Sequence, residues 1–118
     1  MGQTYRTLMS LSLFPPAPKQ TPNEHGVFTD AQEHWVMKTK QVSVKARFAK
    51  SKAGFHWGLD INAPTHGMCY GPSVDQAVKT QAKAELLALK EAQSYLNEYN
   101  ITNKDIDSFV RTLEAALR

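Results

Sequence analysis

Two neighbouring segments alternate apolar and polar residues, and this alternation constrains the fold more than any other feature of the chain. In the first segment every second residue is apolar: Val42, Val44, Ala46 and Phe48. The second segment repeats the pattern with Phe55, Trp57, Leu59 and Ile61. A period of two predicts β-strands with one apolar and one polar face. Because an isolated hairpin is marginally stable in water, the apolar face needs a cover.

Two amphipathic segments near the C-terminus can supply that cover. Apolar residues recur at helical spacing in the first of them: Val74, Val78, Ala82, Leu86, Leu89 and Leu96. Ser73 and Gln76 match a capping box, so we predict a helix from about 73 to 97. A second helix is predicted to begin near Thr102. Its apolar stripe consists of Ile106, Phe109, Val110, Leu113 and Leu117.

The predicted fold class is α+β. We expect an antiparallel meander of two or three strands, the third at 68–70, packed on the long helix with the C-terminal helix beside it. The first strand is expected to extend back toward Trp35, with a bulge or break on the way. The face of the sheet turned away from the helix, with Lys45, Arg47 and His56, is expected to face solvent.

The chain is long enough for one domain, since it has 118 residues. Residues 15–24 hold four of the six prolines and no large apolar residue. This composition is typical of a polyproline-like or disordered linker. We therefore expect a flexible arm over residues 1–30 and a single α+β domain over residues 31–118.

Positive charge is concentrated in the first half of the sequence. Residues 1–59 carry eight Lys/Arg and three Asp/Glu, whereas residues 60–118 carry six and eight. No acidic residue lies between Glu33 and Asp60. That stretch contains six basic residues: Lys38, Lys40, Lys45, Arg47, Lys50 and Lys52. They form either a binding surface for phosphates or for an acidic protein, or simply the solvated face of a hairpin.

The order strand–strand–strand–helix resembles the latter part of a double-stranded-RNA-binding domain. That resemblance implies contact with nucleic acid at the start of the last helix. It is a resemblance of topology, because the corresponding turn here carries Asp75 and Gln76. Aromatic residues can also stack on bases. We expect Phe55 and Trp57 in the core and leave both environments open for Trp35.

The segment Ser10-Leu11-Ser12-Leu13-Phe14 resembles the peptide by which bacterial replication and repair proteins dock on the sliding clamp. Its usual form is Gln-Leu-Ser/Asp-Leu-Phe, so Ser10 departs from the pattern. The resemblance implies that Leu11, Leu13 and Phe14 anchor the arm in a groove of a partner. The alternative is that these residues form an edge strand or fasten the arm to its own domain.

Several other classes of protein find little support. Cys69 is the only cysteine, which excludes a disulfide scaffold. With His66 it would supply two of the four ligands of a structural zinc site. The chain has no glycine-rich phosphate loop and no serine nucleophile elbow. No apolar run reaches the ~20 residues of a membrane span. We expect a cytoplasmic protein that is not an enzyme and has no metal or cofactor.

These observations predict a small non-enzymatic binding module, an accessory factor that contacts nucleic acid through a basic β-hairpin. The alternative is a protein–protein interaction factor, such as a phage- or plasmid-type inhibitor or adaptor of a host complex. It would dock on an acidic or grooved protein through the basic face or the Leu-Ser-Leu-Phe segment. The sequence leaves the partner and the oligomeric state open.

Overall fold

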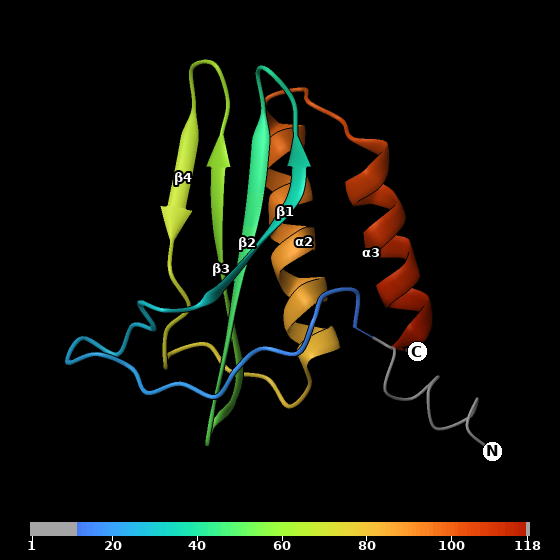
Figure 1. Cartoon of the computed structure of the whole chain (residues 1–118). Helices are drawn as coiled ribbons and strands as arrows, with labels where there is room; N and C mark the ends of the chain where they lie inside the picture. Colours follow the sequence, from blue (N-terminus) through green and yellow to red (C-terminus); the bar gives the residue numbers. More distant parts are fainter. Residues whose placement is uncertain (1–11, 118) are drawn as a thin grey trace.

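The computed structural model describes residues 12–117, which form a four-stranded antiparallel sheet followed by two helices (Figure 1). The strands are β1 (Gln32–Lys38), β2 (Ser43–Ser51), β3 (Gly54–Asn62) and β4 (Gly67–Tyr70). The helices are α2 (Gln81–Glu98) and α3 (Lys104–Ala116). The strands follow one another in the order β1-β2-β3-β4, so the predicted α+β meander is confirmed. It has four strands where we expected two or three.

The additional strand arises because the first predicted strand is divided by a turn. The hydroxyl of Thr39 accepts a hydrogen bond from the N–H of Val42 at 2.9 Å and closes the turn between β1 and β2. The expected bulge lies within β1, where the pairing register shifts between Trp35 and Met37. This shift keeps Trp35 and Lys38 on the same face of the sheet as their β2 partners, Lys45 and Ser43.

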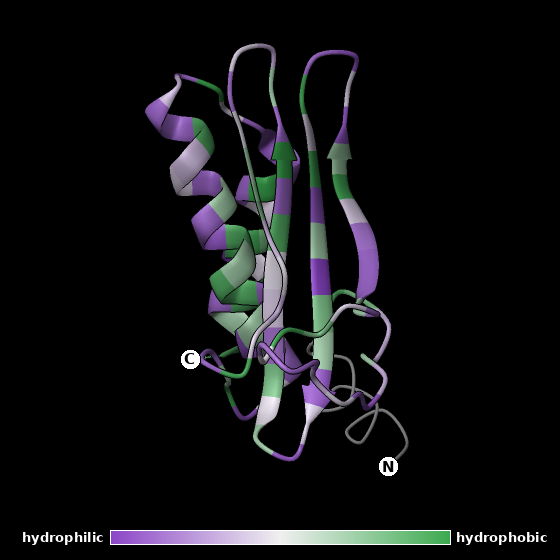
Figure 2. Ribbon diagram, turned by 90° about the vertical axis from the view of Figure 1, so that its left-hand side faces the viewer, coloured by the Kyte–Doolittle hydropathy of each residue, from purple (hydrophilic) through white to green (hydrophobic). Residues whose placement is uncertain are grey.

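Helix α2 covers the apolar face of β2 and β3, and α3 lies beside it next to β1 (Figures 1 and 2). The residues at the centre of this interface are fully buried: Val44, Ala46, Leu59, Ile61, Leu89 and Ala92. Full burial of a large aliphatic side chain contributes ~1.5–3 kcal/mol. Trp57 belongs to the same cluster at 8% exposure, as predicted.

Helix α2 begins later than the sequence indicated. Its N-cap is Thr80, whose side chain accepts a hydrogen bond from the N–H of Lys83. The preceding residues pair with other segments instead of forming a helical turn: Ser73 bridges to Val27, and Val78 to Phe55. Our predicted start at residue 73 was therefore wrong, because these tertiary hydrogen bonds outweigh a local capping pattern. The C-terminal helix begins after Asn103, close to the predicted position.

The face of the sheet opposite α2 is closed at one end. His56, which we expected in solvent, is fully buried. Its Nδ1 lies 2.8 Å from the carbonyl oxygens of both Ser73 and Gln76. Because both carbonyls accept, Nδ1 carries a hydrogen. The ring of Phe28 covers His56 at a centroid distance of 4.5 Å. The prediction of a wholly solvated face was wrong at this end.

The arm contributes to this closure. We predicted flexibility over residues 1–30, but residues 18–28 cross the sheet and are hydrogen-bonded to β2 and to the segment after β4 (Figure 1). The N–H of Gln20 donates to the carbonyl of Lys50 at 2.7 Å, and the N–H of Phe28 donates to that of Pro72 at 2.9 Å. Residues 1–11 lie outside the described part of the chain.

Replacing Gly58 with alanine tests this closure. An added Cβ would lie 2.4 Å from the carbonyl oxygen of Tyr70 and 2.8 Å from the nitrogen of Pro72. Because both contacts are with backbone, we expect Gly58→Ala to lower the free energy of unfolding by about 1–3 kcal/mol or more in urea titrations. The control Asn62→Ala changes an exposed residue of the same strand. It should shift the value by no more than about 0.5 kcal/mol. Equal stability of the two variants would contradict the observed closure.

Candidate nucleic-acid interface

The other end of this face is not covered by the arm, and we call it the open face. The register places side chains of all four strands on it, because directly paired residues point to the same side of a sheet. In β1 and β2, Glu33 lies opposite Arg47, and Trp35 lies opposite Lys45. The open face comprises Glu33, Trp35, Lys38, Ser43, Lys45, Arg47, Asp60, Asn62 and Cys69.

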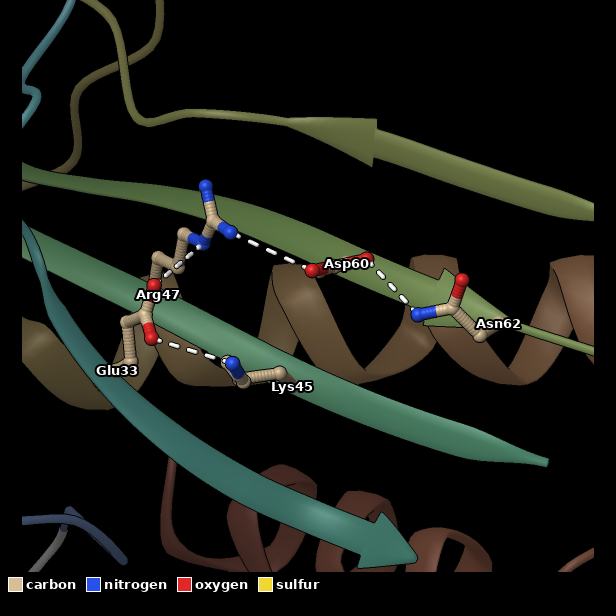
Figure 3. Close-up of polar contacts among 5 residues, drawn as sticks. All are labelled: Glu33, Lys45, Arg47, Asp60 and Asn62. Carbon is tan, nitrogen blue, oxygen red and sulfur yellow. Dashed lines mark hydrogen bonds and ion pairs between the residues drawn. The ribbon is translucent and has the colours of Figure 1, made fainter.

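Ion pairs connect the charged residues at its centre (Figure 3). The carboxylate of Glu33 lies 3.2 Å from Nζ of Lys45 and 3.3 Å from Nε of Arg47. Nη2 of Arg47 is 3.4 Å from Oδ2 of Asp60, and Asn62 donates to the other oxygen of that carboxylate. These side chains are about a quarter to half exposed. Such pairs contribute at most ~1 kcal/mol each, so a phosphate can compete for the cations.

Trp35 is the large aromatic residue of the open face and is 50% exposed. Nζ of Lys45 lies 4.5 Å from the ring centroid, and Nζ of Lys38 lies 4.6 Å from it. Both distances fall within the range of cation–π attraction. The sequence had left the environment of Trp35 open. The bulge in β1 and the pairing with Lys45 place it on the polar side of the sheet.

Lys38 and Lys40 extend the open face toward the β1–β2 turn. Lys38 ends β1 and Lys40 belongs to the turn, and both are exposed. Among the ion pairs of residues 12–117, neither lysine takes part in one. They therefore present their full charge to solvent, unlike Lys45 and Arg47.

Lys50 and Lys52 lie apart from this group. Lys50 shares its face of β2 with the inward-facing Phe48, and its Nζ lies 5.3 Å from the ring of Phe55. It is separated from Lys45 by five residues of strand, or ~16 Å. Lys52 lies in the β2–β3 turn, and Lys19 of the arm pairs with Lys50. The six basic residues thus form two groups at different ends of β2, and Lys50 lies on the opposite face from Lys45 and Arg47.

The Leu-Ser-Leu-Phe segment lies against the domain where it is described. The N–H groups of Leu13 and Phe14 donate to the two carboxylate oxygens of Glu85, at 2.6 and 3.3 Å. The Phe14 ring stacks on His34 at 5.1 Å and lies 5.6 Å from Phe48. Leu13 is 37% exposed, and Leu11 lies outside the described residues. The contacts of Phe14 agree with the second interpretation of the sequence, in which the arm is fastened to its own domain.

Gln81, one turn before Glu85 on α2, continues this attachment. Its Oε1 accepts from the N–H of Ala17 at 2.7 Å, and its Nε2 donates to the carbonyl of Pro15 at 2.8 Å. Sequence reasoning missed both residues. The available signal was a Gln and a Glu one turn apart on the apolar side of a helix, beside Ala82 and Leu86.

Ser51 and His56 have the spacing of a nucleophile and its base, since Ser51 Oγ lies 2.7 Å from Nε2 of His56. The same Oγ accepts from the N–H of Ala53 and thereby closes the β2–β3 turn. His56 is fully buried and is hydrogen-bonded to main-chain carbonyls. We therefore interpret the pair as a structural link between the hairpin and the segment before α2.

The described residues offer neither a metal site nor a membrane-spanning helix. Within residues 12–117, no three His, Cys, Asp or Glu side chains lie close enough together to hold a metal ion. In the same part of the chain, no helix is both long and apolar enough to span a membrane. Cys69 is an exposed free thiol on the open face.

Comparisons of the chain with protein-family models, with curated proteins and with solved structures found no match. The two resemblances noted in the sequence therefore stay predictions.

The attachment of the arm predicts a pH dependence. Burial raises the pKa of the Glu85 carboxyl, while hydrogen bonds from Gln81, Leu13 and Phe14 partly oppose this effect. In the unfolded chain a glutamate ionises near pH 4.3. Between that pH and the raised folded pKa, the folded state binds more protons, so stability must fall as pH rises. We expect the free energy of unfolding of the wild type, relative to Glu85→Gln, to decrease across this window and then level off.

The measurement is a series of urea titrations at several pH values. Glu98→Gln is the matched control, because it makes the same change at an exposed position of α2. It should follow the wild-type profile. A wild-type curve parallel to that of Glu85→Gln at every pH would contradict the prediction.

Proposed function

We propose that this protein is a non-enzymatic accessory factor that binds nucleic acid through the open face and the adjoining β1–β2 turn. The observation that carries the proposal is the concentration of Lys38, Lys45 and Arg47 on the part of the sheet that neither α2 nor the arm covers, with Lys40 in the adjoining β1–β2 turn. Two carboxylates, of Glu33 and Asp60, lie among them, so a net positive charge remains. A positive patch of this kind attracts the phosphate backbone.

The two types of lysine environment suggest different contributions. Lys38 and Lys40 are exposed and take part in no ion pair within the described residues, so they can meet phosphates without breaking an ion pair. Lys45 and Arg47 are held by Glu33 and must exchange its carboxylate for a phosphate. The ion pairs keep these two long side chains ordered, which reduces the entropy lost on binding.

The group of Lys19, Lys50 and Lys52 is a secondary contact in this proposal. It lies ~16 Å along β2 from Lys45, so only a longer nucleic acid would reach both groups. Shortening the nucleic acid should therefore first remove the contribution of these three lysines to the affinity.

The alternative of a protein-interaction factor docking through the arm has less support. Phe14, which the resemblance assigns as an anchor, is packed against His34 and Phe48. Leu13 is exposed, but its N–H is held by Glu85. Use of this segment by a partner would require these contacts to break.

A salt titration tests the proposal. Binding of a fluorescently labelled oligonucleotide, measured by anisotropy, should weaken steeply with salt. Each phosphate contact contributes ~0.7–0.9 to the slope of log K against log salt. The double variant Lys38→Gln/Lys40→Gln should lower both the affinity and this slope. As the matched control, Lys83→Gln/Lys104→Gln removes two exposed helical lysines and should change neither. Binding that is independent of salt would rule out phosphate recognition.

Glu33→Gln tests the same surface in the opposite direction. Loss of the Glu33 charge frees Lys45 and Arg47 from their 3.2 and 3.3 Å ion pairs. We expect tighter binding and a steeper salt dependence, measured with the same oligonucleotide. Circular dichroism would verify that the sheet is intact. Weaker binding by a folded Glu33→Gln variant would contradict the role of Lys45 and Arg47.

A further inference from the structure

We infer that the nucleic acid recognised by the open face is single-stranded and that Trp35 stacks on one of its bases. This inference rests on the proposed function and narrows it to one class of ligand. Trp57, the other tryptophan, is 8% exposed in the core, whereas Trp35 is 50% exposed among cations. Stacking of bases on aromatic side chains is a common means of binding single strands.

The surroundings of Trp35 suit both parts of a nucleotide. The ring offers a flat apolar surface, and the ammonium groups of Lys38 and Lys45 lie 4.6 and 4.5 Å from its centroid. Lysine side chains are flexible, so either ammonium can leave the ring when a base covers it. Each remains close enough to meet the phosphate of the stacked nucleotide. The ring of Trp35 would thus bind the base, while Lys38 and Lys45 bind the adjoining phosphate.

Polar groups that can reach base edges lie on the same face. Ser43 pairs with both Lys38 and Asn62, so these three residues form a row across β1, β2 and β3. Asn62 is exposed and presents an amide with both donor and acceptor capacity. Trp35 and Lys45 form the next row of the sheet. A strand laid across the sheet can therefore contact an aromatic ring, cations and an amide together.

A duplex cannot use this surface in the same way. Its bases are stacked on one another, and a single aromatic ring on a sheet face reaches only its backbone. The carboxylates of Glu33 and Asp60 also lie between the cations of the open face. They disfavour the dense phosphate array of a duplex more than the sparser backbone of one strand. The open face therefore favours unpaired bases.

The test compares two probes with the full chain: an oligothymidylate of about 12 nucleotides and a duplex of the same length, within the site sizes of known single-strand binders. We expect the single strand to bind at least about tenfold more tightly. Trp35→Leu should weaken its binding about five- to 150-fold, as for loss of one stacked base, without changing the salt slope. Trp35→Phe, which retains a ring, should lose less. The single strand should also quench the tryptophan fluorescence of the wild type.

Tyr99→Leu is the matched control, since it removes a ring that is 38% exposed next to α2, outside the open face. It should bind like the wild type. Salt-dependent binding that is equal for the duplex, or that is unaffected by Trp35→Leu, would overturn the inference and leave the proposed function standing. Absence of salt-dependent binding to either probe would overturn both.

Discussion

The packing of α2 against the apolar face of β2 and β3 is the interaction on which the rest of the structure depends. It buries the alternating side chains of both strands, from Val44 to Ile61, against Leu89 and its neighbours. A two-layer domain can cover only one face of its sheet with helices. The other face must therefore be covered by other segments or carry polar residues. The chain closes one end of that face with the arm and the segment before α2, and leaves the other end polar.

His56 holds the closed end together. It joins β3 to the carbonyls of Ser73 and Gln76 and to the hydroxyl of Ser51, beneath the ring of Phe28. A buried imidazole with both nitrogens hydrogen-bonded avoids the cost of an unpaired polar group. Since this link occupies the segment that precedes α2, it also explains why the helix begins at Gln81 and not at the earlier capping pattern.

The attachment of the arm follows a similar rule. Gln81 and Glu85 meet the backbone of residues 13–17 with hydrogen bonds, and the Phe14 ring fills the space beside Phe48. The proline-rich composition, which suggested flexibility, suits an extended segment that makes no helix or sheet of its own. Such a segment is ordered by contacts that its own sequence does not reveal. Because the arm is occupied by these contacts, we place the proposed binding surface at the lysines and Trp35 and not on the arm.

By itself, the sequence determined the strands of β2 and β3, the face that α2 covers, the presence of two helices and the burial of Trp57, because each depends on a local period in side-chain polarity. It also located the basic residues, but it did not determine where α2 begins. Only the tertiary structure decided that Lys45 and Arg47 share Glu33, that Trp35 is exposed and that His56 is not. These outcomes depend on strand register and on segments distant in sequence, and no local pattern encodes either.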